Sequence, residues 1–513
     1  MIKGVIKKGA YFDSVTLMIV SKDLNKIEGV ADSSVVMGTN ENKSILKMAE
    51  LYIDMFDDAD DTDMLIAIDA ENDEAFNKAV DFIEKELDAI RNSSDDTSDF
   101  APKSFESALK LMPDANLSLI SVAGKYAVAE VNKALNANLN VMLFSDNISV
   151  EDELKMKQKA VEKGLLMMGP DCGTAIINEI PLAFANVVNK GNIGIVAASG
   201  TGLQEVSSII TNLGGGISQA IGTGGRDVKK EIGGIMFIEA LKALEKDEQT
   251  KVICLISKPP HPEVLDKIAS EIKKLKKQVV AIFIGADEKT VSASGAIPAV
   301  NLEQAAVISV ALAEDKDYKE ALNELNARQE KNKTLAKELA KNNKGKYIRG
   351  LYSGGTLCDE AQLLLKDTIG YTYSNTPLND DYQLSDIWKS QEHTIIDLGE
   401  DEFTAGRPHP MIDFSLRNRR VVDEAKDTDT AVILLDVVLG YGSNLSPEKE
   451  FAPVFEEAKK INPNVAIICS VTGTDKDPQN RAKVKQTLEN AGAIVMNTNV
   501  EAVELAESIV SFL

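Results

Sequence analysis

The chain is poor in the residues that most often carry side-chain chemistry. Its 513 residues include four cysteines, three histidines and one tryptophan. The cysteines form no CxxC pair, which argues against a disulfide framework or a zinc knuckle, and we expect buried small hydrophobic residues at Cys172, Cys254, Cys358 and Cys469. Any histidine chemistry is restricted to His261, His393 and His409.

Long apolar runs and basic clusters are also missing. No stretch approaches the roughly 18 apolar residues of a membrane-spanning helix, and the N-terminal MIKGVIKKGAYFDS lacks the apolar core and cleavage site of a secretory signal. The net charge is -24, whereas nucleic acid is bound through Lys and Arg clusters. We therefore expect a cytoplasmic protein without nucleic-acid or membrane partners, in which any anion site has a local positive potential.

Two nucleotide-binding fingerprints are absent as well. The first strand-to-helix turn of the regular α/β region, SVAGKYAVAEV, has one glycine, and no G-x-x-x-x-G-K-[ST] motif occurs. The sequence argues against an NAD dehydrogenase and against a P-loop ATPase.

The residues that are present divide the chain into four blocks. Residues 1–92 mix short β-type runs, such as SVTLMIV at 14–20 and DMLIAID at 63–69, with helical patterns, which predicts a small α+β domain. A polar linker follows. Strands then alternate with helices, which predicts an α/β fold with parallel sheets in the blocks 105–188, 189–315 and 347–513, with a charged helical connector over 315–346.

The last two blocks look like diverged copies of one unit. Strand IGIVAAS and turn GTGL in one match YIRGLYS and GGTL in the other, and QAIGTGGRD matches TIIDLGEDEFTAGRPHP. The order of elements carries this repeat as much as identity does. Two such units could face each other.

A glycine-rich turn begins a helix in each copy. The first turn consists of Ser199, Gly200, Thr201 and Gly202, and the second of Ser353, Gly354, Gly355 and Thr356. Unpaired N–H groups and the helix dipole make such a turn suitable for phosphate or carboxylate. Glycines that merely form a tight turn would look the same, but the recurrence of the turn favours anion binding.

A basic loop lies beyond the second strand of each copy. The loops contain Gly224, Gly225 and Arg226 in one copy, and Gly406, Arg407 and His409 in the other. Arginine can hold phosphate or carboxylate with two parallel hydrogen bonds, although Arg226 could instead form a structural salt bridge with Asp227 or Glu231.

Three further observations concern single residues. His409, between two prolines, can donate to an anion or act as acid or base, whereas we expect His261 and His393 to be structural. Lys258 and Asp436 follow apolar strands, where open α/β sheets place ligands. Asp436 could be a rim residue, a helix cap or a substrate contact.

The chain resembles the FdrA proteins over nearly its whole length. The blocks that carry this resemblance are MMGPDCGTAIIN (167–178), GNIGIVAASGTGLQEVSSIITNLGGGISQAIGTGGRD (191–227), HTIIDLGEDEFTAGRPHPMID (393–413) and SVTGTDKDPQNR (470–481). FdrA proteins in turn resemble succinyl-CoA synthetases without the ATP-grasp part. The resemblance implies a Rossmann-like CoA-binding-type domain at 105–188 and two flavodoxin-like ligase-type domains, α-subunit-like at 189–315 and β-subunit-like at 347–513.

Two residues depart from the synthetase pattern. Ala293 stands where the phosphate-carrying histidine of the G-H-A-G-A motif would be, and Lys258 stands where a supporting glutamate would be. The CoA-binding glycine turns of the synthetase α subunit have no clear equivalent. These departures argue against ATP-dependent CoA ligation, so the sequence assigns no cofactor and no metal and leaves CoA binding open.

The resemblance implies carbamoyl transfer instead. FdrA proteins are associated with oxamate carbamoyltransferase in anaerobic allantoin breakdown, a purine degradation route, and act in an oligomer with AllG and AllH subunits. The substrates are oxalurate, oxamate and carbamoyl phosphate. Carbamoyl phosphate is already activated, so the protein has to orient the reactants and stabilise charge on the departing phosphate.

From this resemblance we expect particular roles. Phosphate binding is expected at the two glycine turns and at Gly224, Gly225 and Gly399. Arg226 and Arg407 would bind phosphate or the oxamate carboxylate, and His409 and Lys258 would polarise the carbamoyl carbonyl, with no covalent enzyme intermediate. Two alternatives stay open: a nucleotide-dependent acyl-CoA synthetase, and a non-catalytic scaffold or regulatory subunit.

Overall fold

The structure is a computed structural model, and it describes residues 1–10, 12, 14–24, 27–49, 51–95, 102, 104–404 and 408–513. These residues form two compact units. Unit 1 consists of Met1–Ala115 with Gly399–Asp413, and unit 2 of Asn116–Leu398 with Phe414–Leu513. No helix in the described part of the chain is long and apolar enough to cross a membrane.

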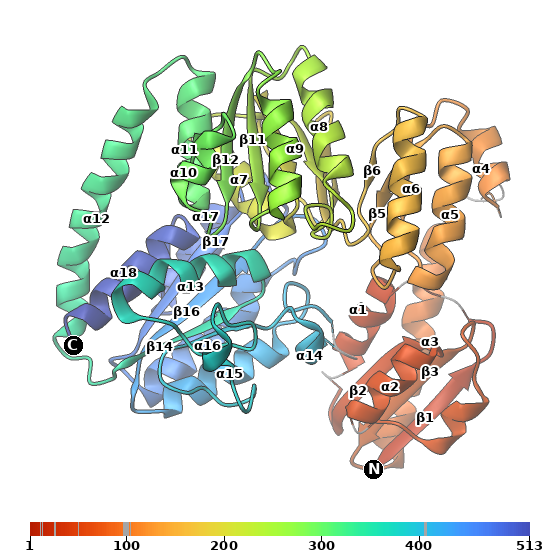
Figure 1. The fold of residues 1–513 in the computed structure, drawn as a ribbon. Coiled ribbons are helices and arrows are strands. Elements are labelled where there is room, and N and C mark those ends of the chain that lie inside the picture. Colours follow the sequence, from red (N-terminus) through yellow and green to blue (C-terminus); the bar gives the residue numbers. More distant parts are fainter. Residues whose placement is uncertain are drawn as a thin grey trace. The chain divides into compact units, whose positions relative to one another are not determined.

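Unit 1 contains a three-stranded antiparallel sheet in the order β1-β3-β2 (Figure 1). The strands are β1 (Ile2–Lys7), β2 (Val30–Met37) and β3 (Met64–Ala70). The helices are α1 (Ser14–Leu24), α2 (Asn40–Met48), η1 (Asp54–Asp58), α3 (Asp73–Asp95), α4 (Phe105–Leu111) and α14 (Asp401–Thr404). The α+β class expected for the N-terminal region is confirmed.

One predicted strand of this unit is wrong. The run at 14–20 lies within helix α1, where Leu17, Val20 and Leu24 are buried against the sheet at helical spacing. A short apolar run with β-branched residues cannot be separated from a buried helix by periodicity alone. The run at 63–69 forms β3 as predicted.

Unit 2 begins with a small parallel sheet in the order β4-β5-β6. Its strands are β4 (Leu117–Ile120), β5 (Asn140–Leu143) and β6 (Met167–Met168). The helices α5 (Gly124–Asn136) and α6 (Val150–Glu162) connect them. The alternation of strand and helix expected from residue 105 is confirmed.

A seven-stranded sheet follows in the order β13-β12-β11-β9-β10-β7-β8. Its strands are β7 (Thr174–Ile177), β8 (Ile180–Ala183), β9 (Lys190–Ala197), β10 (Ile217–Gly222), β11 (Val252–Ser257), β12 (Gln278–Phe283) and β13 (Ile297–Pro298). The helices are α7 (Gly200–Asn212), α8 (Ile235–Lys246), α9 (Pro262–Ile272), α10 (Glu288–Ala293) and α11 (Leu302–Ala313). The β7–β8 hairpin is antiparallel and was not predicted; the strands from β9 to β13 are parallel.

The helix α12 (Tyr318–Ala340) leads to a five-stranded parallel sheet in the order β15-β14-β16-β17-β18. Its strands are β14 (Tyr347–Tyr352), β15 (Thr394–Asp397), β16 (Thr430–Val438), β17 (Ala466–Thr472) and β18 (Ile494–Met496). The helices are α13 (Gly355–Ile369), η2 (Asp380–Tyr382), α15 (Ser415–Lys426), α16 (Pro447–Ile461), α17 (Arg481–Asn490) and α18 (Asn499–Ser511).

The last two sheets repeat one topology. In the first sheet, β10 lies on one side of β9, and β11, β12 and β13 follow in chain order on the other side. In the second sheet, β15 lies on one side of β14, and β16, β17 and β18 follow on the other side. We call residues 189–315 the first half and residues 347–513 the second half. Helix α7 contacts α13, and α11 contacts α18, so the helices of the two halves face each other within unit 2 (Figure 1). The predicted repeat is confirmed at the level of topology.

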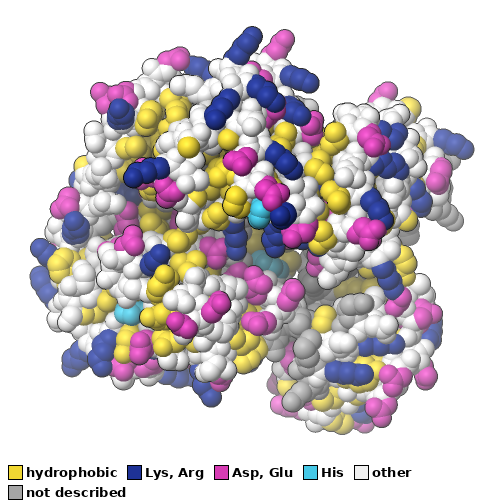
Figure 2. Space-filling model, viewed as in Figure 1, with side chains coloured by type: hydrophobic (Ala, Val, Ile, Leu, Met, Phe, Trp, Pro, Cys, Tyr) yellow, Lys and Arg dark blue, Asp and Glu magenta, His cyan; other side chains and the backbone are white. Residues whose placement is uncertain are grey.

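Charges are mixed over the molecular face in view. Lys and Arg side chains are interspersed there with Asp and Glu side chains and form no continuous basic patch (Figure 2). The face in view thus offers an anion no extended basic surface.

Candidate functional site

The two glycine turns lie at the topological switch points of the two sheets. β9 is flanked by β10 and β11, and β14 is flanked by β15 and β16. Ser199 follows β9 and Ser353 follows β14, so both turns are at the carboxyl ends of their sheets. This is the position at which open α/β folds bind ligands.

The two turns are in direct contact. The hydroxyl oxygens of Ser199 and Thr356 are 2.7 Å apart. A Cβ atom on Gly354 would lie 2.8 Å from Cγ2 of Thr201, and one on Gly202 would lie 3.2 Å from Cγ2 of Thr356. Both glycines are therefore needed for the close approach of the helices, and the expectation that the two copies face each other is confirmed.

In the second half, a carboxylate of the chain itself occupies the turn. Asp436 accepts hydrogen bonds from Ser353 N at 2.8 Å, and from Ser353 Oγ and Gly354 N at 2.9 Å. Asp436 and the neighbouring Arg417 are fully buried, with Oδ1 and Nη2 3.3 Å apart. Of the three roles considered for Asp436, the structure shows a cap on the start of α13.

In the first half, the corresponding position is Ser257. Ser257 follows Ile256, which pairs with Ala197, just as Asp436 follows Leu435, which pairs with Leu351. Ala197 lies two residues before Ser199, and Leu351 lies two residues before Ser353. Ser257 is fully buried, and its hydroxyl has no hydrogen-bond partner among the described residues.

The first-half turn thus keeps its donors. The N–H groups of Ser199, Gly200 and Thr201 have no acceptor in the part of the chain that the structure describes. Gly200 is exposed, whereas Ser353 and Gly354 are buried. An anion placed at Ser199 and Gly200 as Asp436 is placed at Ser353 and Gly354 would receive the same two backbone hydrogen bonds, with the α7 dipole behind them.

Lys258 joins the two halves at this site. Its Nζ is 2.6 Å from Oδ2 of Asp359, which lies in the second turn of α13. The Lys258 side chain is 65% exposed and that of Asp359 is 13% exposed. Burial raises the pKa of Asp359, and the Lys258 ammonium opposes that rise. Lys258 is thus a predicted cation that forms an ion pair between the two halves, and its role toward a ligand stays a prediction.

Arg226 is part of a buried ion-pair network. Its Nε is 2.9 Å from Oε2 of Glu153. The fully buried Lys157 contacts Glu153 at 2.8 Å and Asp227 at 2.7 Å, which ties α6 to the loop after β10. The structural salt bridge that the sequence left open is present, with Glu153 as the partner rather than Asp227 or Glu231. A ligand role for Arg226 stays a prediction.

The glycines beside Arg226 differ from each other. Gly224 has φ +82°, and a Cβ atom there would lie 2.3 Å from the Pro170 carbonyl oxygen. The nearest atom to a Cβ on Gly225 would be the Ala198 carbonyl oxygen, at 3.9 Å. The turn itself requires Gly224, whereas Gly225 leaves room beside the end of β9.

Three predicted site residues are not among the described residues of unit 2. Gly399 and His409 belong to unit 1, and Arg407 lies outside the described residues, as does Gly406. His409 forms a local turn, because its Nδ1 accepts a hydrogen bond from Met411 N at 3.2 Å. The ligand roles of Gly399, Arg407 and His409 stay predictions.

The other histidines and the cysteines have structural settings. His261 Nδ1 accepts from Glu263 N at the start of α9, and His393 Nδ1 accepts from Ile348 N. Burial lowers the pKa of His393 to about 4. All four cysteines are buried, and burial raises the pKa of each thiol, to about 12 for Cys172, Cys254 and Cys469 and well above its usual range for Cys358. Both expectations are confirmed.

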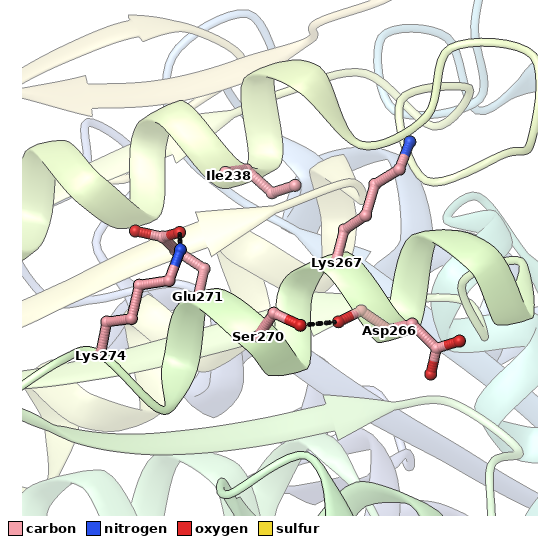
Figure 3. A pocket seen from close by; sticks show the side chains of 6 residues that line it. All are labelled: Ile238, Asp266, Lys267, Ser270, Glu271 and Lys274. Atoms are coloured by element: carbon pink, nitrogen blue, oxygen red, sulfur yellow. Dashed lines mark hydrogen bonds and ion pairs between the residues drawn. The ribbon is translucent and has the colours of Figure 1, made fainter.

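A surface pocket beside α8 and α9 offers no comparable chemistry. It is lined by Ile238, Asp266, Lys267, Ser270, Glu271 and Lys274 (Figure 3). Lys274 pairs with Glu271 at 2.8 Å, and the Ser270 hydroxyl donates to the Asp266 carbonyl at 2.8 Å. Within the described residues, no group of three or more His, Cys, Asp or Glu side chains is arranged to hold a metal ion.

The fold and the paired turns define a protein of the CoA-ligase type. Residues 351–509 match the CoA-ligase family and residues 188–285 match the CoA binding domain. Residues 1–102 match the AllF, heavy metal-associated domain. The CoA-binding match falls on the block expected to be a ligase-type domain, and the domain boundaries drawn from the sequence stay a prediction.

The particular family follows from one full-length relative. YahF of Escherichia coli (strain K12) is 42% identical over 514 residues, which covers 99% of this chain and 98% of YahF. This chain belongs to the family of YahF, an FdrA-like family of the CoA-ligase type with an AllF-type N-terminal domain. The predicted FdrA resemblance is confirmed.

Similarity to other proteins is partial. The succinate–CoA ligase [ADP-forming] subunit alpha 2 of Archaeoglobus fulgidus is 32% identical over 177 residues, 34% of this chain and 60% of that subunit. The dinucleotide-forming acetyl-coenzyme A synthetase 1 of Ca. Korarchaeum cryptofilum covers 77% of this chain and 83% of its own, with 14% identity and a TM-score of 0.33.

The family descriptions imply two ligands, a heavy metal and CoA, and the residues do not fit the first. Residues 1–102 contain neither cysteine nor histidine, so the thiolate and imidazole donors typical of heavy-metal sites are missing. A CoA pyrophosphate is an anion, and the turn at Ser199 and Gly200, which keeps its backbone donors, is a place in the described residues where such a group fits.

Proposed function

We propose that this chain is a subunit of an oxamate carbamoyltransferase-like enzyme of allantoin and purine breakdown. The enzyme would interconvert oxalurate and phosphate with oxamate and carbamoyl phosphate, and the chain would act with AllG-like and AllH-like subunits. FdrA-like family membership and the AllF-type N-terminal domain support this proposal. The observation that carries it is the first-half turn, which has the donors of the second-half turn but no built-in carboxylate.

The phosphate group takes, in the first half, the place that Asp436 takes in the second. The N–H groups of Ser199 and Gly200 and the hydroxyl of Ser257 donate to it, and the α7 dipole adds positive potential. This local field is what an anion needs in a chain with a net charge of -24.

The reaction needs only the two substrates. A phosphate oxygen attacks the ureido carbonyl carbon of oxalurate, the C–N bond to the oxamate nitrogen breaks, and that nitrogen takes up a proton. In the reverse direction the oxamate nitrogen attacks carbamoyl phosphate, the C–O bond breaks and phosphate leaves with the electron pair. Because carbamoyl phosphate is an acyl phosphate, neither ATP nor a phosphorylated residue is required.

Individual residues have distinct tasks in this scheme. Lys258, beside α13, polarises the carbonyl that is attacked. Arg226 and Arg407 bind phosphate or the oxamate carboxylate, and His409 donates to the carbonyl or moves the proton. Ala293 has no side-chain group that could carry phosphate, which is consistent with direct transfer of the carbamoyl group between phosphate and oxamate.

The test is the formation of carbamoyl phosphate from oxalurate and phosphate, followed by phosphorus NMR, with this chain and its partner subunits. We expect turnover that requires this chain. Full turnover by the partner subunits alone would make the chain a scaffold or regulatory subunit. Unchanged turnover in both Arg226→Ala and Arg407→Ala would remove the arginines from the site.

A second candidate is an acyl-CoA ligase, which the CoA-ligase match over residues 351–509 favours. Calorimetry with CoA and with ADP distinguishes it. Specific binding of both ligands, together with release of phosphate that depends on CoA, would favour the ligase over carbamoyl transfer.

A further inference from the structure

Two buried glutamates lie behind the paired glycine turns. Glu205 is five residues beyond the first residue of α7, and Glu360 is five residues beyond the first residue of α13. They are 2% and 3% exposed. Buried carboxylates need hydrogen-bond partners, so their partners show what these residues do.

Each glutamate accepts a hydrogen bond from the start of a helix in the opposite half. Glu205 Oε1 accepts from the N–H of Asn499, the first residue of α18, at 2.9 Å. Glu360 Oε1 accepts from the N–H of Leu302, the first residue of α11, at 2.7 Å. These N–H groups have no partner within their own helices. Since α11 and α18 are the last helices of the two halves, the exchange is reciprocal.

The other two carboxylate oxygens are also occupied. Glu360 Oε2 accepts from Asn499 Nδ2 at 2.8 Å, and Glu205 Oε2 accepts from the Thr472 hydroxyl. Asn499 Nδ2 also donates to the Leu357 carbonyl at 3.1 Å, which fixes the orientation of its amide. Glu205 therefore has both of its partners in the second half, and Asn499 contacts both glutamates.

This arrangement controls the turns because a helix is a rigid element. If the second turns of α7 and α13 are fixed to the opposite half, their first turns have a defined spacing. At the turns themselves, the described contact between the halves is one hydroxyl–hydroxyl hydrogen bond and the packing of Gly202, Thr201 and Gly354.

We propose that Glu205 and Glu360 are a reciprocal pair of positioning residues that holds the α7 and α13 turns in register and so shapes the anion site of the first half. The effect of the two glutamates on ligand binding rests on the proposed function. Their role in setting the register of the two turns is independent of that function.

The register can be tested by cross-linking without any ligand. The Ser199 and Thr356 oxygens are 2.7 Å apart, so a Ser199→Cys/Thr356→Cys variant is within disulfide reach. The rate of disulfide formation is measured in this background, alone and with Glu205→Gln, with Glu360→Gln and with both. The matched control is Glu448→Gln, since Glu448 is equally buried but pairs with Lys483 inside the second half, at 2.7 Å.

We expect the double variant Glu205→Gln/Glu360→Gln to form the disulfide at least tenfold more slowly than the parent cysteine variant, and the Glu448→Gln control to form it at the parent rate. Equal rates in the double variant and in the control overturn the proposal. Circular dichroism checks folding, and the single variants, together with Asn499→Ala, decide the matter if the double variant does not fold. Of the two bonds between Asn499 and the glutamates, Asn499→Ala keeps the N–H that Glu205 uses and removes the one to Glu360. It also removes the amide's bonds to Leu357 and Tyr352, which both lie inside the second half. It is therefore expected to slow cross-linking less than the double Gln variant.

A second readout separates this inference from the proposed function. Binding of inorganic phosphate is measured by calorimetry on the chain without added cysteines. Affinity at least tenfold weaker in Glu205→Gln or Glu360→Gln than in Glu448→Gln supports both proposals. Slower cross-linking with unchanged phosphate affinity supports the role in setting the register and contradicts an effect of the two glutamates on the anion site. Slower cross-linking with no phosphate binding by the unmodified chain supports the same role and contradicts the proposed anion site.

Discussion

The two halves of unit 2 have the same strand order and the same turn, but they treat the turn differently. In the second half Asp436 lies against Ser353 and Gly354, and Arg417 lies behind it. In the first half the corresponding residue is Ser257, which leaves the turn open. The second half shows which chemical group the backbone donors bind, and in the first half no carboxylate of the described residues takes that place.

This difference supports the proposal that an acidic chain holds an anion at the first-half turn. The second-half turn is internally neutralised by Asp436, so an added phosphate would meet a like charge there. The first-half turn has no carboxylate at that position, and Lys258 of the same half lies near the start of α13. The comparison shows a structural role for Asp436 at one turn and supports the proposed ligand-binding role of the other.

The largest expected effect is on stability, from Asp436→Asn. The substitution leaves the fully buried Arg417 without its counter-charge, and breaking a buried pair costs about 3–5 kcal/mol. Urea unfolding should show a loss of that size. The control is Ser257→Ala at the corresponding position, where removing a hydroxyl without a described partner should change the free energy of unfolding by less than about 1 kcal/mol. Equal losses would end the distinction between the halves.

The next effect concerns ligand binding, from Ser257→Asp. The new carboxylate is placed where it can take the N–H groups of Ser199 and Gly200, as Asp436 does in the second half. A hydrogen bond to a charged group contributes about 1.5–3 kcal/mol, so the loss of two such bonds should lower phosphate affinity at least about 100-fold. Ser257→Asn is the neutral control of similar size. If both variants bind phosphate equally well in calorimetry, the first-half turn is not the anion site.

The sequence predicted what local patterns determine. Buried parallel strands read as continuous apolar runs, and glycines mark the turns, so the α/β alternation, the repeat and the positions of the two turns could all be inferred. The same patterns failed where the local signal is ambiguous. The run at 14–20 is as apolar as a strand but forms α1, and the short hairpin of β7 and β8 gave no distinct period.

The differences that decide function come from tertiary register. That Asp436 and Ser257 occupy corresponding positions depends on how β16 pairs with β14 and how β11 pairs with β9. Glu205 and Glu360 look like ordinary polar helix residues, because nothing nearby in the sequence shows that their partners begin helices of the other half. The sequence also pointed to Asp227 or Glu231 for Arg226, whereas its partner is Glu153 on α6.

A smaller effect should appear in the pH dependence of stability. Burial raises the pKa of Glu360 to about 8, against the lowering effect of the Leu302 and Asn499 donors. Between the ordinary value of 4.5 and about 8, the folded chain keeps a proton that the unfolded chain has lost. The free energy of unfolding contributed by this group therefore falls as pH rises through that window.

Glu360→Gln cannot titrate and should lack this contribution. Relative to the unmodified chain, the variant should become more stable between pH 5 and pH 8, whatever constant penalty the amide introduces. Glu448→Gln, at an equally buried glutamate of the same half, is the control. Parallel curves for Glu360→Gln and the unmodified chain in urea unfolding at several pH values would contradict the raised pKa.

The smallest stability effect is expected at the contact between the halves, from Lys258→Met. The Lys258 side chain is 65% exposed, and exposed ion pairs contribute about 0–1 kcal/mol. Asp359, whose pKa burial already raises, can take up a proton when the ammonium is removed, so the free energy of unfolding should change by less than about 1 kcal/mol. Methionine keeps the apolar stem, which isolates the charge. If Lys258 polarises the substrate carbonyl, the turnover of this variant falls while its free energy of unfolding does not. A loss of stability as large as that of Asp436→Asn would instead make Lys258 a structural residue. The two turns would then differ only in the carboxylate that Asp436 supplies to one of them.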